Sequence, residues 1–563
     1  MKKTLLLSAL VLFASTPVNG NLLDGLLRLP GNQPEQGNEQ VQLIVTRFNQ
    51  TDIISELLSN GRLVDAWGLH EVLLVDADRA EAVKALLERL PGVRNVVVDA
   101  KVQAPEPDYS PAPPSMSALA MPDSGSNTAS TSYNDPGYGE QFHWRDRSTT
   151  LKGASSIAAA VAKAQAQERL SIAILDTGFQ HHDAFTWAGG YNFWGQDNNG
   201  PKVGGEYATW PDYKNCTQNH GQIVGSVLGA PQNSGSGITG MLEADYYGVR
   251  VAGCNGSGNL STMAQGIRWA AGDRSLKAPA IANRAQIINI SMAAQVGSRS
   301  CPGYLQEAID FARHRGAIIV ASAGNSPGVP GEEIAPANCR GVIAVGAVDR
   351  QGNKASFSTS GSNLAYSALG QWVPVEDRQG YYTASGTSFS APIVSGMLAL
   401  LWQTVPALTA SEVTAFSIDS TTAFGNTGGH AMGRGVLNGL QLLESAVNSI
   451  FQPELRVAHP FESDCQGDLI AQFHSAQLNV CDLREIILSD ERMADNRFAV
   501  LYSVPQGKAL RSFNGQVVMG QASRQFVLRE WDRDRQYGLQ ICDQADGTGC
   551  DSTHLGGGGG GGG

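Results

Sequence analysis

The sequence predicts an α/β protein whose largest domain is built on a parallel sheet with helices on both faces. Between about 134 and 450, runs that are apolar at nearly every position recur, as in S-I-A-I-L at 171–175 and G-A-I-I-V-A at 316–321. Such runs are typical of strands that are buried on both faces. Amphipathic helical patterns separate them, for example at 261–271. This alternation favours a parallel sheet, with reactive groups at the carboxyl ends of its strands.

The composition excludes two classes of function. The 563 residues include 40 Lys and Arg against 52 Asp and Glu, a formal net charge of −12. Because the chain has no basic footprint, we expect no nucleic-acid partner. No apolar run after the N-terminus reaches the roughly 18 residues that span a bilayer, so we expect no integral membrane segment.

Residues 1–20 are predicted to be a secretory signal peptide. Lys2 and Lys3 precede an apolar stretch at 4–14, and small or turn-forming residues follow as far as Gly20. This order of charged, apolar and small residues is typical of export signals. We therefore expect a secreted protein, extracellular or periplasmic, and transient surface attachment stays open.

Export permits disulfide bonds, and the chain has an even number of cysteines. Proximity in the sequence favours the pairs Cys465–Cys481 and Cys542–Cys550, with the other four pairing among themselves. The eight positions are Cys216, Cys254, Cys301, Cys339, Cys465, Cys481, Cys542 and Cys550.

Residues 41–102 have the pattern of a small α+β domain. Each helical segment is amphipathic, and Pro91-Gly92 ends the second of them. The predicted order is strand 41–48, helix 51–59, strand 70–77, helix 80–90 and strand 94–100.

Three further segments differ in composition. Residues 103–133 hold six prolines between 105 and 122, which predicts an extended linker with a processing site. Residues 451–555 hold four cysteines and short alternating strands, which predicts a small disulfide-stapled β-rich domain for binding, secretion or stability. The eight glycines at 556–563 form a flexible end, an expression scar or the remnant of a sorting signal.

Three reactive side chains follow or precede elements of the predicted sheet domain. Asp176 ends a buried strand, where a carboxylate is costly unless something uses it, and a helix-cap or turn aspartate is the alternative. His220 opens a helix rich in Gly, Ala and Ser, and a surface or capping histidine is the alternative. Ser388 follows Gly386, which permits an unusual backbone angle, at the start of a long apolar helix. That helix N-terminus can stabilise negative charge, and a plain N-cap is the alternative.

Together the three side chains indicate nucleophilic catalysis. A serine hydroxyl needs a base, and the base needs a third group that holds its tautomer. With Asp176, His220 and Ser388 in this chain order and G-T-S-F-S-A-P at 386–392, the chain resembles the secreted bacterial subtilisin-like serine peptidases, the subtilase family, over roughly 41–450.

The resemblance implies an architecture. It makes 134–450 a subtilisin-like catalytic domain and 41–102 a ferredoxin-like propeptide. Such a propeptide assists folding and acts as an intramolecular inhibitor until it is removed. The family usually has His-Gly-Thr-His where this chain has His220-Gly221-Gln222-Ile223, which leaves the support of the histidine in question.

The resemblance also assigns roles. Asn325, in A-S-A-G-N at 321–325, becomes the oxyanion donor together with the N–H of Ser388. Two segments that look like the family's substrate-binding strands are Asn289, Ile290, Ser291, Met292 and Ala293, and Gly256, Ser257 and Gly258.

The implied activity is that of a self-processed endopeptidase. It acts on protein or peptide substrates through an acyl-enzyme, as a monomer, without a cofactor for catalysis. Structural calcium is expected by family resemblance only, and the loop Q-D-N-N-G at 196–200 is expected to be a turn. We name no metal ligands.

Two alternatives belong to other classes. G-N-S-P-G at 324–328 matches the nucleophile elbow of α/β-hydrolase esterases, with Ser326 as nucleophile. However, P-G-V-P-G follows at 327–331 and cannot start the helix that this elbow needs. The second alternative is a catalytically silent peptidase fold that serves as a binding or adhesion protein. Loss of hydrolysis without loss of binding would support it.

Overall fold

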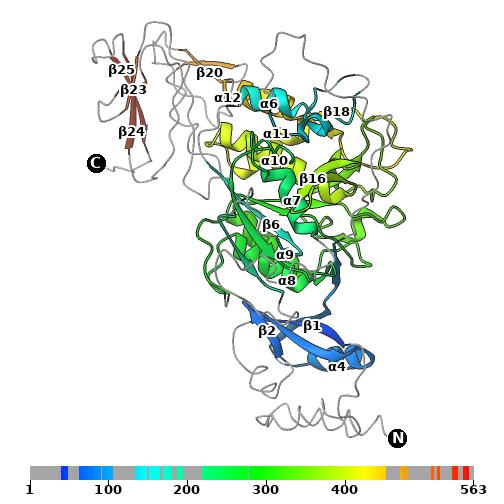
Figure 1. Ribbon diagram of the computed structural model, residues 1–563. Helices are drawn as coiled ribbons and strands as arrows, with labels where there is room; N and C mark the ends of the chain where they lie inside the picture. The colour runs from blue at the N-terminus through cyan, green and yellow to red at the C-terminus, as the bar shows by residue number, and fades with distance from the viewer. Residues whose placement is uncertain are drawn as a thin grey trace, which may run out of the picture. The chain divides into compact units, whose positions relative to one another are not determined.

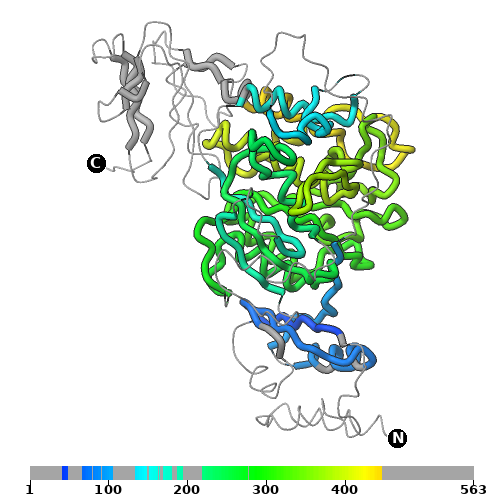
Figure 2. Tube along the Cα trace, in the orientation of Figure 1, coloured from blue at the N-terminus to red at the C-terminus, as the bar shows by residue number. Residues whose placement is uncertain are grey.

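The computed structural model describes most of the chain between residues 40 and 451 (Figure 2). After 451 it describes only the backbone of six strands. The predicted signal peptide, the helix at 51–59, nearly all of the linker, the 196–200 loop, Cys465, Cys481 and the last seven glycines lie outside the described residues. The described ranges are 40–48, 63–104 without 91, 133–146, 148, 151–164, 169–179, 185, 187–194 and 219–451 without 277.

The chain divides into two compact units. The first comprises 1–158, 169–399 and 421–437, and the second comprises 159–168, 400–420 and 438–563. No described helix is both long enough and apolar enough to cross a membrane.

The first unit begins with a four-stranded antiparallel sheet in the order β2-β3-β1-β4, on which one helix packs (Figure 1). Three of these strands and the helix confirm the sequence prediction. The strand β2 was not predicted, although Gly68, at φ +56°, marks the two-residue turn that joins it to β3. The elements are β1 Gln40–Arg47, β2 Leu63–Trp67, β3 His70–Asp76, α4 Ala80–Leu87 and β4 Val93–Val98.

The two faces of this small sheet bury different side chains. Successive residues of a strand point to opposite faces. Leu43 and Val45 of β1 pack against α4 residues such as Val83 in a core of their own. Ile44 and Val72 lie instead in the core that continues into the large domain. The small sheet is therefore buried on both faces.

The large sheet confirms the predicted parallel architecture. Its order is β18-β19-β15-β14-β12-β10-β6-β8-β7, and only the β18–β19 pair is antiparallel. All residues of β6, β10 and β12 are buried. The strands are β6 Ser171–Asp176, β7 Gly189–Asn192, β8 Asp245–Arg250, β10 Ile287–Ile290, β12 Ile318–Ser322, β14 Val342–Val348, β15 Leu364–Leu369, β18 Thr421–Thr422 and β19 Val436–Leu437.

Helices cover the strands on both sides, as expected. The helix α8 contacts β6 and β8, α9 contacts α8 and β12, and α7 contacts β6. In Figure 1, α8 and α9 lie below the label of β6, and α7 and α10 lie above it. The bounds are α7 His220–Gly229, α8 Leu260–Ala270, α9 Gly303–His314 and α10 Thr387–Thr404.

The second unit holds helices α11 Ala410–Asp419 and α12 Gly439–Phe451, which contact each other. Thr409 and Glu412 form a capping box at the start of α11. The six later strands form antiparallel pairs, in keeping with the predicted β-rich segment. They are β20 Ile470–Phe473, β21 Ala476–Asn479, β22 Ala509–Ser512, β23 Val517–Met519, β24 Gln536–Cys542 and β25 Cys550–Gly556.

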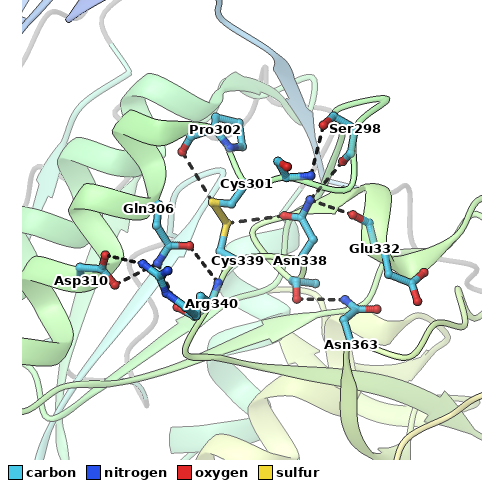
Figure 3. The surroundings of a disulfide bond; sticks show 12 residues. Ser298, Cys301, Pro302, Gln306, Asp310, Glu332, Asn338, Cys339, Arg340 and Asn363 are labelled. Atoms are coloured by element: carbon cyan, nitrogen blue, oxygen red, sulfur yellow. Dashed lines mark hydrogen bonds and ion pairs between the residues drawn. A yellow bond between two sulfur atoms is a disulfide. The ribbon is translucent and has the colours of Figure 1, made fainter. Parts of the chain in front are cut away.

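One disulfide, Cys301–Cys339, joins the chain just before α9 to the chain just before β14 (Figure 3). Beside it, the Gln306 side chain donates to the carbonyl of Arg340 at 3.0 Å and accepts from its N–H at 2.9 Å. Cys254 is also disulfide-bonded. These three cysteines belong to the four that were expected to pair among themselves. The backbone register sets Cys542 opposite Cys550, and their disulfide stays a prediction.

Candidate active site

The strand β6 places Asp176 at the carboxyl end of the sheet with no exposed surface. One of its oxygens, Oδ1, accepts the N–H of Thr177 at 2.7 Å and lies 2.7 Å from Nδ1 of His220. A neutral histidine that donates from Nδ1 keeps Nε2 as an acceptor. The arrangement therefore fixes the tautomer in which Nε2 can take a proton.

Small residues let α7 approach the end of β6 closely. A Cβ atom at Gly221 would overlap the carbonyl oxygen of Gly178 and lie 3.0 Å from the Cβ of Asp176. Only glycine therefore allows His220 to reach Asp176. Gln222, which stands where the family usually has threonine, is buried in the same helix.

Ser388 lies in the first turn of α10 and is almost completely buried. Its hydroxyl donates to the carbonyl of Ser291 at 3.0 Å. Among the described residues, Nε2 of His220 has no hydrogen-bond partner. The ring of the next residue, Phe389, has its centre 6.2 Å from that of His220. Catalytic hydrogen bonds are often formed only in the substrate complex, so the free Nε2 is compatible with a base role.

A proline inside α10 couples this helix to β10. Pro392 has no N–H, so the carbonyl four residues earlier, that of Ser388, loses its usual helical partner. That carbonyl instead accepts the hydroxyl of Ser291 at 2.8 Å. Asn289 donates to the same hydroxyl at 3.1 Å and accepts from Ser395 at 2.9 Å. The first turn of α10 is thus fixed against β10 by buried hydrogen bonds.

The side-chain amide of Asn325 has a defined orientation. Its Oδ1 accepts the N–H of Thr387 at 3.0 Å and the Thr387 hydroxyl at 2.8 Å. Because Oδ1 has two donors, Nδ2 is the amide atom left to donate. A Cβ on Gly386 would lie 3.2 Å from this Nδ2.

The predicted reason for Gly386 was wrong. Gly386 is not among the residues with positive φ. Glycine instead leaves space beside the amide of Asn325, so a larger residue here would crowd that amide.

The predicted substrate strands are paired with the chain's own N-terminal part. The short strand β5, Lys101–Gln103, pairs antiparallel with β9, Ser257–Asn259. On its other side Gln103 pairs with Ala293, and the N–H of Ala104 donates to the carbonyl of Gly256 at 2.8 Å. Gln103 and Ala104 therefore belong to a strand pairing, which corrects the predicted start of the linker at 103.

Not every predicted substrate residue offers its side chain. Asn289, Ile290 and Met292 are completely buried. The side chain of Asn289 is used within the hydrogen bonds that join β10 to α10, and the other two lie in the hydrophobic core. The backbones of Ala293, Gly256 and Gly258 are the parts that face β5.

Comparison with known proteins gives the family. The model of the subtilase family matches residues 167–435. Subtilisin Savinase from Lederbergia lenta is 32% identical over 273 residues, which are 48% of this chain and 88% of that protein. The chain belongs to the subtilase family.

A second relative and a solved structure agree with this subtilase assignment. The thermostable alkaline protease of Halalkalibacterium halodurans is 35% identical over 268 residues, 46% of this chain and 66% of that protein. This chain thus spans just under two thirds of that relative. A solved protease structure from Pseudoalteromonas arctica aligns with a TM-score of 0.51 and 28% identity, covering 56% of this chain and 100% of that one.

The esterase alternative does not fit the subtilase fold. Ser326 is exposed and lies in a loop, and turn residues follow it directly instead of an α-helix. Its N–H and carbonyl are bonded to the hydroxyl of Thr359. A nucleophile elbow needs a strand, a sharp turn and then a helix.

The described part of this subtilase contains no group of three or more His, Cys, Asp or Glu side chains that could hold a metal ion. Sequence reasoning missed the roles of three residues that arrange the site: the hydroxyls of Thr387 and Ser291, and the missing N–H of Pro392. Pro392 stood in the quoted G-T-S-F-S-A-P block, and its missing N–H was the available signal.

Proposed function

We propose that this chain is a secreted serine endopeptidase that hydrolyses peptide bonds through an acyl-enzyme. The observation that carries the proposal is the buried Asp176–His220 hydrogen bond beside the first turn of α10, which holds Ser388. His220 takes the proton of Ser388 as its oxygen attacks the peptide carbonyl. Asp176 holds the tautomer and stabilises the imidazolium that forms. His220 then protonates the leaving amine and activates the water that releases the acyl group.

The oxyanion forms where donors converge. The Nδ2 of Asn325 is free to donate because Thr387 occupies Oδ1. The N–H of Ser388 lies at the N-terminus of the 18-residue helix α10, where backbone donors and the positive end of the dipole favour negative charge. Donors that are already oriented stabilise the transition state without further reorganisation.

Substrates bind as extended peptides between two strands of the enzyme. The backbones of Ala293 and of Gly256–Gly258 already accept one added strand, β5. Main-chain pairing of this kind suits protein and peptide substrates, because it does not depend on one side chain.

The N-terminal α+β segment at 40–104 acts as an inhibitor in the same molecule. Its β5 takes the place where a substrate strand would pair. The enzyme is therefore made as a zymogen, exported by the signal peptide at 1–20 and matured by cleavage within the following linker, as a monomer. A structural calcium ion stays a matter of family resemblance.

The test compares wild type with Ser388→Ala and with Ser326→Ala as matched control. Wild type and Ser326→Ala should digest casein, react with a fluorophosphonate and lose roughly the first hundred residues. Ser388→Ala should remain full-length and unlabelled and should not digest casein. Casein digestion by purified Ser388→Ala would contradict the proposal. A wild type that binds peptides without cleaving them would favour the silent binding protein.

A further inference from the structure

We propose that the turn Asn255–Ser257 forms a subsite that selects a glutamine side chain in the substrate, at the third residue before the cleaved bond. This inference rests on the proposed peptidase function and names a substrate class for the same site. Gln103 of the N-terminal segment lies on this turn and bonds to Asn255 and Ser257.

Both ends of the Gln103 amide are recognised. Its Oε1 accepts the hydroxyl of Ser257 at 2.9 Å. Its Nε2 donates to the carbonyl of Asn255 at 3.2 Å and to the carbonyl of Ala104 at 3.0 Å. A carboxylate lacks the donor that the Asn255 carbonyl needs, and an apolar side chain of the same length lacks both partners. The turn is therefore complementary to a side-chain amide.

Hydrogen bonds within the turn itself hold its backbone. The N–H of Ser257 donates to Oδ1 of Asn255 at 3.0 Å, and the N–H of Gly256 donates to the carbonyl of Gly253 at 3.0 Å. Gly256 has φ +79°, a conformation that other residues rarely adopt. Because the backbone of the turn is held by these bonds, little backbone ordering is needed when a side chain binds.

The strand register places this side chain relative to the nucleophile. Gln103 pairs antiparallel with Ala293. Two residues before Ala293 is Ser291, whose carbonyl accepts the hydroxyl of Ser388. In an antiparallel pair, the substrate residue two positions after the glutamine lies opposite Ser291. The bond that follows that residue is the one beside Ser388.

The residues on either side of Gln103 differ from it in exposure. Val102 and Ala104 are 1% and 0% exposed, whereas Gln103 is exposed. In a peptide bound in this way, the residues on either side of the glutamine are buried and the glutamine lies at the surface. For hydrogen bonds partly open to water we expect about a fivefold preference, the effect of roughly one net hydrogen bond.

The experiment uses matured wild type and three p-nitroanilide peptides, Val-Gln-Ala-Phe, Val-Met-Ala-Phe and Val-Glu-Ala-Phe. The kcat/KM for the Gln peptide should exceed that for the Met peptide about fivefold, and the Glu peptide should be slowest. In Ser257→Ala the Gln-to-Met ratio should fall towards one, and Ser257→Thr, which keeps the hydroxyl, should restore it. Ser411→Ala, an exposed serine of α11, is the matched control and should keep the ratio. Because both peptides are measured with the same enzyme sample, the Gln-to-Met ratio does not depend on how much of each variant is folded.

A Gln-to-Met ratio near one in wild type would overturn the subsite while leaving the peptidase intact. If no peptide and no casein is hydrolysed, the proposed function fails instead, and a second readout decides the subsite. In the full-length Ser388→Ala chain, Gln103→Met should speed hydrogen exchange at the N–H of Ala104, which donates to Gly256, about fivefold. An unchanged exchange rate would overturn the inference.

Discussion

At the scale of single residues, Thr387 links the backbone of Gly324 to the side-chain amide of Asn325, the proposed oxyanion donor. Its hydroxyl accepts the N–H of Gly324 at 3.2 Å and donates to Oδ1 of Asn325 at 2.8 Å. The residue is 1% exposed. Because its hydroxyl is used by these two hydrogen bonds, we regard it as a positioning residue for the amide of Asn325.

If Thr387 has this role, substitutions at Asn325 and at Thr387 should lower kcat by different amounts. Asn325→Leu removes a donor to the oxyanion and should lower kcat about 10²–10³-fold with little change in KM. Thr387→Val keeps the donor but removes a hydrogen bond that orients it, so kcat should fall less, about tenfold. Steady-state kinetics with one nitroanilide peptide measure both effects.

Thr387→Ser is the control for this pair, because it keeps the hydroxyl and should restore most of the activity. A fall in stability without a fall in kcat would mean that Thr387 is only structural. Equal losses for Thr387→Val and Asn325→Leu would also contradict the graded expectation.

The sequence predicted Asp176, His220 and Ser388 because each stands at the border of a local pattern, a buried strand or a helix start. It did not predict that Ser291 bonds to Ser388, since those residues are 97 positions apart. Contacts between distant segments depend on the strand order, which local patterns leave open. The role of Gly386 was misread for the same reason, because its neighbour Asn325 is far away in the chain.

At the scale of elements, the parallel strands were predictable and the short pairings were not. Runs such as 171–175 are apolar throughout, which identifies β6 directly. The strand β5 has only three residues and exists because β9 and Ala293 lie on either side of it. The predicted boundary between the small domain at 41–102 and the linker at 103–133 fell inside this strand. Pairing partners can thus override local propensity in short segments.

The disulfide gives an element-scale prediction. Cys301 and Cys339 close a loop of 38 residues between the start of α9 and the start of β14. A loop of this size stabilises a folded chain by about 3–4 kcal/mol, mainly by restricting the unfolded state. In the Ser388→Ala background, which prevents self-digestion, Cys301→Ser with Cys339→Ser should lower the free energy of unfolding by this amount in urea titrations.

Reduction of the single Ser388→Ala chain provides the comparison. On reduction, its free energy of unfolding should fall by more than that of the chain that also lacks Cys301 and Cys339. An unfolding free energy unaffected by the double change would show that the hydrogen bonds of Gln306 alone fix this junction.

At the scale of the whole first unit, Asp99 joins the N-terminal segment to the large domain. It accepts the N–H of Ser261 at 3.1 Å, at the start of α8, and the hydroxyl of Tyr304 at 2.7 Å, on α9. Burial raises the pKa of Asp99 to about 6, against the opposing effect of these hydrogen bonds. The contact therefore depends on pH.

The raised pKa determines whether the contribution of Asp99 grows or falls as pH rises. A carboxyl that binds its proton more tightly in the docked state contributes fully below its free pKa, near 4, and loses that contribution as pH rises through about 6. In the full-length Ser388→Ala chain, hydrogen exchange in β4 should therefore become faster between pH 4 and pH 6 than the intrinsic rates explain. Asp99→Asn should remove this component.

His70 provides the opposing control. Burial lowers the pKa of His70, despite its contact with Glu307 at 3.1 Å, so its contribution is lost as pH falls. In Asp99→Asn only this opposite trend should remain. Identical pH profiles of the Asp99→Asn and Asp99 chains would contradict the role of Asp99.

The strand order of the large sheet affects how fast the protein folds and unfolds. Its central pairs join strands far apart in the chain, such as Ile172 with Ile287 and Ile287 with Ile318. Few native contacts can form before distant segments meet, so the search for the native state is slow. A barrier that slows folding also separates the native state from the unfolded one. For the secreted enzyme proposed above, we expect the lifetime of the active form to be set by its unfolding rate rather than by its equilibrium stability.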